Sequence, residues 1–79
     1  MRLRIRYYGV LTDITNCEVE MIEMDDRNTG ANLVSKLHEK YPDFTNHSIV
    51  YFADGKKLEQ GENISSITEI DCMPPFSGG

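Results

Sequence analysis

Residues 30–42, GANLVSKLHEKYP, are the one long helical pattern in this sequence of 79 residues. Their apolar side chains recur at spacings of three and four, which predicts an amphipathic helix over residues 30–41. Asn28 or Thr29 is suited to cap its start, and Pro42 ends it because proline restricts the preceding residue. The face turned toward a core would carry Leu33, Val34, Leu37 and Tyr41.

Two strand patterns precede this helix. Residues 2–8 alternate cleanly, so that Leu3, Ile5 and Tyr7 fall opposite the arginines and Tyr8. Residues 17–22 alternate again and predict a second strand, which pairs with the first in a hairpin joined by residues 9–16. In this second strand one face would carry Cys17, Val19 and Met21, and the other Glu18, Glu20 and Ile22.

Three further strand patterns follow the helix. Residues 49–53 form an apolar run rich in β-formers, and Asp54-Gly55 is a hairpin signal leading into residues 56–58. Residues 59–66 read as a loop. A last strand over residues 67–73 ends where Pro74 and Pro75 remove further ladder donors.

The resulting order, β-β-α-β-β-β, is that of an α+β domain of the β-grasp, or ubiquitin-like, fold. We expect a mixed sheet of four to five strands packed on one main helix. Residues 1–73 would form this β-grasp domain, and residues 74–79 an extended, flexible C-terminal Gly-Gly tail. The expected core comprises Leu3, Ile5, Val19, Leu33, Leu37, Ile49 and Ile70.

Composition excludes several classes of protein. Thirteen acidic residues against eight basic ones give a net charge of −5, whereas nucleic-acid modules usually carry a basic face. No apolar run approaches the roughly 20 residues of a membrane helix, and no apolar stretch of a signal peptide follows the basic start. We therefore expect no nucleic acid, no membrane, and a cytoplasmic protein whose two cysteines, Cys17 and Cys72, pack as reduced thiols.

The usual catalytic constellations are missing from the sequence. It has no glycine-rich phosphate loop, no C-x-x-C and no H-E-x-x-H motif. His38 and His47 are nine residues apart and do not stand at metal-ligand spacing, so no metal and no bound cofactor are expected. Neither Ser65 nor Ser66 has a base set up beside it. Whether Cys17 or Cys72 is reactive stays open.

The sequence ends with the segment Pro74-Pro75-Phe76-Ser77-Gly78-Gly79. Two prolines favour an extended conformation, and two glycines without side chains fit a narrow channel. Six residues span about 20 Å. The predicted reactive group is the carboxylate of Gly79 at the tip of this arm, and the residues inserted with it would be Pro74, Pro75, Phe76, Ser77 and Gly78.

The chain resembles the small, sulfur-carrying subunit of molybdopterin synthase, within the MoaD/ThiS family of ubiquitin-like sulfur carriers. The resemblance spans nearly the whole chain. It rests on the segments Tyr7-Tyr8-Gly9-Val10-Leu11, Tyr41-Pro42, Asp54-Gly55, Glu69-Ile70 and the Pro74–Gly79 tail. Thr12, Asn16, Asp71, Cys72, Phe76 and the segment Ile67-Thr68-Glu69 depart from the family's pattern.

The resemblance implies a cycle in which an activating enzyme uses ATP to adenylate Gly79. A sulfur donor then forms a thiocarboxylate, and the tail enters the active site of the molybdopterin synthase large subunit. Sulfur passes there to the pyranopterin precursor of the molybdenum cofactor. In this scheme the chain is a cosubstrate, and the acid–base groups that catalyse the reaction lie on its partner.

The tail also needs a docking surface on the globular body, for which Tyr8, Met73 and Phe76 are candidates. Edge packing explains these side chains equally well. Three other functions stay open: a carrier for thiamine or another pathway, a ubiquitin-like modifier joined through Gly79 to a lysine amine, and a binding module with an inert tail.

Overall fold

The computed structural model describes residues 1–25 and 28–75 of the chain. Its elements follow one another as five strands, two α-helices and a 3-10 helix within this part of the chain. They are β1 (Arg2–Tyr7), α1 (Val10–Thr15), β2 (Val19–Glu23), α2 (Gly30–Lys40), the 3-10 helix η1 (Pro42–Asn46), β3 (Val50–Ala53), β4 (Lys56–Lys57) and β5 (Glu69–Met73).

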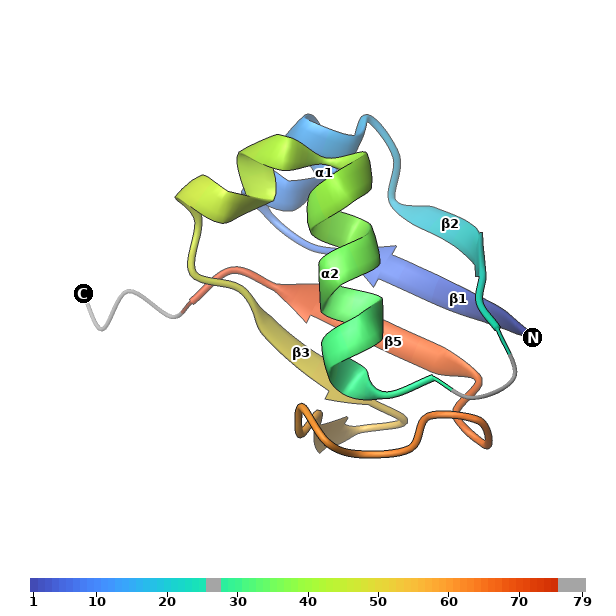
Figure 1. Cartoon of the computed structure of the whole chain (residues 1–79). Helices are drawn as coiled ribbons and strands as arrows, with labels where there is room; N and C mark the ends of the chain where they lie inside the picture. Colours follow the sequence, from blue (N-terminus) through green and yellow to red (C-terminus); the bar gives the residue numbers. More distant parts are fainter. Residues whose placement is uncertain (26–27, 76–79) are drawn as a thin grey trace.

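The five strands form one mixed sheet in the order β2-β1-β5-β3-β4. The central pair, β1 and β5, is parallel, and the remaining pairs are antiparallel. Helix α2 crosses one face of this sheet, and the opposite face carries no helix in Figure 1 among the residues described. The predicted mixed sheet on one main helix is confirmed.

Helix α2 begins and ends as the sequence predicts. The Thr29 hydroxyl accepts a hydrogen bond from the Asn32 amide at 3.3 Å and so caps the first turn. Leu33 and Leu37 are fully buried against the sheet. The helix ends at Lys40, and Pro42 opens the 3-10 helix that follows.

Helix α1 corrects the prediction that residues 9–16 are a plain connection. Leu11 and Thr15, four residues apart, turn into the core, and the Thr15 hydroxyl donates to the Leu11 carbonyl at 3.0 Å. Asn16 ends the helix in the left-handed conformation that asparagine tolerates. Six residues are too few for a helical period to stand out in the sequence.

Strand β2 corrects the predicted faces of the second strand. Residues that face each other in an antiparallel pair share one face of the sheet. Ile22 lies opposite Leu3 and is buried, whereas Val19 lies opposite Arg6 and Met21 opposite Arg4. Val19 is therefore not part of the core, and the assignment of Ile22 to the outer face was wrong.

The core lies between the sheet and the three helices. Five of the predicted core residues are fully buried: Leu3, Ile5, Leu33, Leu37 and Ile70. Ile49 is half-buried and packs against this core. The remaining buried apolar side chains are Tyr7, Leu11, Ile22, Met24, Phe44, Ala53, Ile64 and Cys72.

Candidate functional site

The candidate site is the point where the chain leaves the sheet after β5. Parallel pairing of β1 with β5 brings Tyr8 beside this exit, and the Tyr8 amide donates to the Cys72 carbonyl at 3.2 Å. Met73 lies opposite Val50 on β3. Pro74 is half-buried and Pro75 is exposed. Phe76, Ser77, Gly78 and Gly79, which carry most of the predicted site, lie outside the described residues.

Gly9 packs directly against the base of this tail. Its φ of 58° is one that side-chain-bearing residues rarely adopt, and a Cβ placed there would meet Pro74 Cγ at 3.1 Å. The same loop is held by a hydrogen bond from the Leu11 amide to the Tyr8 carbonyl at 3.1 Å. The loop between β1 and α1 therefore fixes the place from which the tail departs.

An apolar patch surrounds the exit on the open face of the sheet. The register between β3 and β5 puts Val50 and Phe52 on the same face as Asp71 and Met73. The Tyr8 hydroxyl reaches that face as well, 3.4 Å from an Asp71 carboxylate oxygen. We call the set Tyr8, Val50, Phe52 and Met73 the tail-base patch; all four are half-buried.

The structure thus brings Tyr8 and Met73, both predicted from the sequence, side by side. It adds Val50 and Phe52, which sequence reasoning missed. Residues 49–53 are a continuous apolar run, and such a run gives no alternation from which the exposed face could be read. The expected use of Tyr8 and Met73 as a docking surface stays a prediction.

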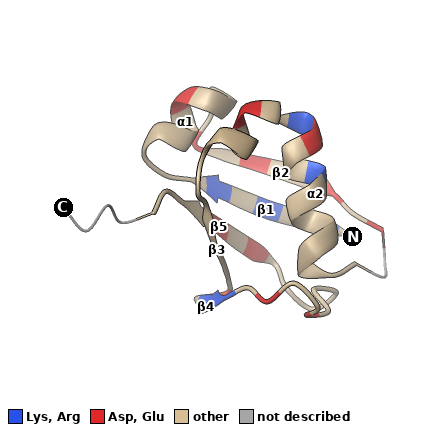
Figure 2. Cartoon of the chain, turned by 60° about the vertical axis from the view of Figure 1, so that its left-hand side comes forward, with Lys and Arg blue, Asp and Glu red and all other residues tan. Residues whose placement is uncertain are grey.

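The rest of the open face carries ion pairs, together with Val19 and Met21 of β2. In Figure 2 the arginines of β1 lie between acidic positions on β2 and β5. Arg2 contacts Glu23 at 2.7 Å, and Arg4 and Arg6 approach Glu69 at 3.8 and 3.9 Å. These pairs are exposed, and exposed ion pairs contribute little to stability. The face is therefore apolar at the tail exit and mixes charged with apolar side chains toward β2.

A polar cluster on the helix side of the sheet joins β2 to the end of α2. Glu20 accepts hydrogen bonds from the Tyr7 hydroxyl at 2.7 Å, the Tyr41 hydroxyl at 2.6 Å and Lys40 Nζ at 2.6 Å. Burial alone would raise the pKa of Glu20, but the bonds from Lys40, Tyr41 and Tyr7 outweigh it and lower the pKa. Burial and the bond to Glu20 raise the pKa of both tyrosines, which stay protonated.

Neither cysteine forms a disulfide. Cys17 is half-buried and Cys72 is buried, as the strand pattern predicted. Burial, and to a lesser degree the Asp71 charge, raises the pKa of the Cys72 thiol, which disfavours the reactive thiolate. Among residues 1–25 and 28–75, no three His, Cys, Asp or Glu side chains gather closely enough to hold a metal ion.

No described helix has the length and apolar character needed to cross a membrane. The sequence matches no protein-family model and no curated protein.

Solved structures do resemble this chain closely in fold. A Pyrococcus furiosus protein described as molybdopterin converting factor, subunit 1, superposes with a TM-score of 0.84 at 11% identity, covering 95% of this chain and 98% of that one. The protein SAMP1 from Haloferax volcanii gives 0.82 at 17% identity, with both chains covered completely. Another structure, of H. volcanii small archaeal modifier protein 1, gives 0.78 at 14% identity over 94% and 97% of the chains. These likenesses confirm the β-grasp fold.

Proposed function

We propose that this chain is a sulfur carrier of the MoaD/ThiS family and acts as the small subunit of molybdopterin synthase. The observation that carries the proposal is the Pro74–Gly79 segment, which follows β5 directly and starts at Pro74, close against Gly9. The structural likeness to molybdopterin converting factor, subunit 1, supports the same assignment.

The chemistry takes place at the Gly79 carboxylate. A carboxylate oxygen attacks the α-phosphorus of ATP on the activating enzyme, and pyrophosphate leaves. Sulfur from the donor then attacks the acyl carbon, AMP leaves with that oxygen, and a thiocarboxylate remains. On the large subunit the sulfur passes to the pterin precursor, and water restores the carboxylate. The chain supplies the carried group and binds neither ATP nor another cofactor itself.

The tail suits this task because its parts differ in stiffness and width. Pro74 and Pro75 favour an extended arm, whereas Gly78 lacks a side chain that would obstruct a narrow channel. Ordering a free residue on docking costs about 1–2 kcal/mol, and proline reduces that cost. The packed base at Gly9 lowers it further, since the start of the arm is already fixed.

The tail-base patch would offset the remaining cost by docking on the partner. Apolar side chains around the exit would be buried as the tail enters the active site, at roughly 25 cal/mol per Å² of apolar surface. The activating enzyme and the large subunit would bind this face in turn. The acidic chain, with its net charge of −5, favours partner surfaces that are basic.

A second function is favoured by the structural neighbours named as modifier proteins. In that case the activated Gly79 carbonyl would be attacked by a lysine amine of a target protein, and an amide would form. Both functions share the adenylation step. They differ in the product, which is a thiocarboxylate for a carrier and a covalent protein adduct for a modifier.

ATP–pyrophosphate exchange by the cognate activating enzyme tests the shared step. Removing Gly79 shortens the arm by about 3.3–3.6 Å, and catalytic geometry tolerates a displacement of about 1 Å. We expect exchange to be lost on deletion of Gly79, on extension by one residue, and in Gly78→Val. All three variants should unfold in denaturant as the unaltered chain does. Wild-type exchange by the deletion or the extension would refute the proposal.

A further inference from the structure

The open face of the sheet differs in charge from the chain as a whole. Within the five strands, the register places four basic and three acidic residues on this face: Arg2, Arg4, Arg6 and Lys57, with Glu23, Glu69 and Asp71. The strands therefore present a small excess of positive charge there, although the whole chain has a net charge of −5. A partner that docks on the open face meets this local charge.

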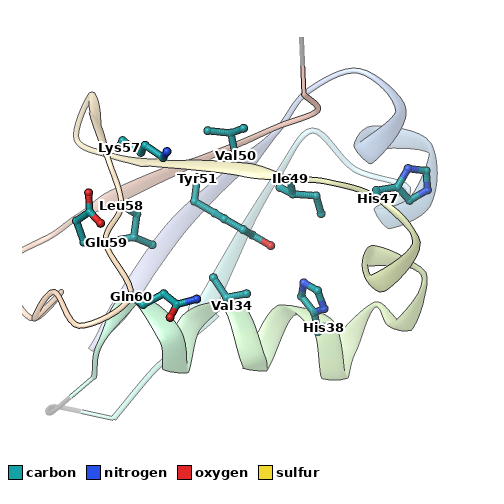
Figure 3. Close-up of a pocket in the computed structure, with 11 residues that line it drawn as sticks. Val34, His38, His47, Ile49, Val50, Tyr51, Lys57, Leu58, Glu59 and Gln60 are labelled. Atoms are coloured by element: carbon teal, nitrogen blue, oxygen red, sulfur yellow. The ribbon is translucent and has the colours of Figure 1, made fainter. Parts of the chain in front are cut away.

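Lys57 lies at the β4 border of the tail-base patch. It pairs with Phe52 across β3 and β4, and directly opposed residues of an antiparallel pair have neighbouring side chains on one face. Figure 3 shows Lys57 and Val50 on one side of β3, and Tyr51 pointing from the other side toward α2. Lys57 is exposed and forms no ion pair with a described residue. Its ammonium group is therefore accessible to a partner that covers Phe52.

Arg6 lies at the β1 border of the same patch. Its neighbour on β5 is Asp71, whose carboxylate oxygen lies 3.4 Å from the Tyr8 hydroxyl. Arg6 approaches Glu69 at 3.9 Å, and Arg4 approaches the same carboxylate at 3.8 Å. Two arginines thus share one carboxylate, which leaves positive charge on this side of the patch unbalanced. The Arg6 side chain is 41% exposed and stays accessible.

Docking would give these charges more weight than they have in water. A surface that covers Phe52 and Met73 also removes water from around their charged neighbours, and a charge that loses water without gaining a partner is costly. A carboxylate placed opposite such a cation offsets this cost. The matching surface is therefore apolar over the patch and acidic at its two borders.

Lysine on an edge strand also has a structural use, because it discourages pairing with a second sheet. Lys56 lies on the same strand and is also exposed, but it pairs with Ala53, which is buried on the helix side. Protection of the edge would involve both lysines alike, whereas docking on the open face involves Lys57 alone. The two lysines therefore form a matched pair for a test.

We propose that the partner surface that docks on the tail-base patch is apolar at its centre and presents carboxylates to Lys57 and Arg6. The inference rests on the proposed function, because it specifies the chemistry of the surface that receives the tail. The net charge of −5 attracts basic surfaces at long range, whereas the contact itself is matched by acidic groups.

The test measures ATP–pyrophosphate exchange by the cognate activating enzyme at increasing concentrations of the full chain. Lys57→Glu should raise the KM for the chain about 5- to 20-fold and leave kcat within about twofold, because two carboxylates would then face each other. Lys56→Glu, with the same change in net charge, should leave the KM within about twofold. Urea unfolding should show both variants to be as stable as the unaltered chain.

The contact at Arg6 has its own matched pair. Arg6→Gln should raise the KM about 3- to 10-fold, because a carboxylate of the enzyme would lose its cation. Arg2→Gln, at the other end of β1, removes the same charge and should leave the KM within about twofold. Equal KM values for these two variants would contradict the carboxylate placed opposite Arg6.

Inhibition by the chain lacking Gly79 separates docking from chemistry. This shortened chain should compete with the unaltered chain for the enzyme, and adding Lys57→Glu should raise its inhibition constant by the same factor as the KM. An unchanged inhibition constant would place the effect of Lys57 in the chemical step and contradict its role in docking.

The sign of the effect separates local contact from net charge. If the enzyme responded to net charge alone, both glutamate variants would lower the KM, because each makes the chain more negative. Equal KM values for Lys57→Glu and Lys56→Glu, with normal exchange by the unaltered chain, would overturn the inference and leave the adenylation step intact. Absence of exchange by the unaltered chain would refute the proposed function, and the inference with it.

Discussion

Gly9 links the backbone of the β1–α1 loop to the tail. Its positive φ means that Gly9→Ala should cost about 1–3 kcal/mol in stability, and the new Cβ would also push against Pro74. A displaced arm should lower adenylation about 10- to 100-fold. Urea unfolding and ATP–pyrophosphate exchange measure the two effects separately.

Gly55→Ala is the matched control for this variant. Gly55 also has a positive φ, 88°, but a Cβ there meets nothing within 4 Å. Gly55→Ala should lose as much stability as Gly9→Ala, while ATP–pyrophosphate exchange stays at the level of the unaltered chain. If both variants lowered exchange equally, the contact between Gly9 and Pro74 would have no role in positioning the tail.

Glu20 makes stability depend on pH. Its pKa is lowered from the ordinary value of 4.5, so its stabilising effect is complete above pH 4.5 and is lost as pH falls through the lowered value. Glu20→Gln should lose about 1–3 kcal/mol at neutral pH, because charge-assisted hydrogen bonds are lost. As the pH falls below 4.5, the urea midpoint of Glu20→Gln should also fall less than that of the unaltered chain. Glu18→Gln, at a half-buried position, should behave as the unaltered chain. If the urea midpoint of Glu20→Gln depended on pH as that of the unaltered chain does, the role of the Glu20 carboxylate would be contradicted.

Helix α2 contributes a large part of the core through two leucines. Leu37 is fully buried, so Leu37→Ala should cost about 2–5 kcal/mol. Glu39→Ala, on the exposed face of the same helix, should change stability by less than about 0.5 kcal/mol. Chemical denaturation measures both, and an unchanged stability in Leu37→Ala would contradict the packing of this helix.

Strand β2 offers a direct check on the face it presents to the helix. Ile22→Ala should cost about 2–5 kcal/mol because Ile22 is buried. Met21→Ala should cost far less, since Met21 is 51% exposed. The reverse order would restore the face predicted from the sequence and contradict the pairing of Ile22 with Leu3.

Strong local patterns explain which elements could be predicted from the sequence. Helix α2 and strand β1 have several apolar residues in a clear period, and Pro42 and the two prolines after Met73 end their elements. In β2 the alternation was visible, but the sequence did not indicate which side of the strand faces the helix. Glu20 occupies a position on the helix side, and only its three distant hydrogen-bond partners make this position tolerable. The same limit applies to the tail-base patch, which joins segments far apart in sequence.

The whole molecule separates its tasks between two sides. The open face of the sheet joins the tail exit to an apolar patch, and the helix side contains the core. Under the proposed carrier function, this chain would supply the tail and its docking surface, and the catalytic groups would lie on its partners.

The most direct test of the carrier function is the intact mass of the protein purified from its native cell. Replacement of one terminal oxygen of Gly79 by sulfur adds about 16 Da, and tandem mass spectrometry places that addition on the last residue. We predict a fraction of the chain with this added mass, which disappears when the activating enzyme is deleted. A chain found only with its unmodified mass, or only as amide-linked adducts on other proteins, would contradict the assignment as a sulfur carrier.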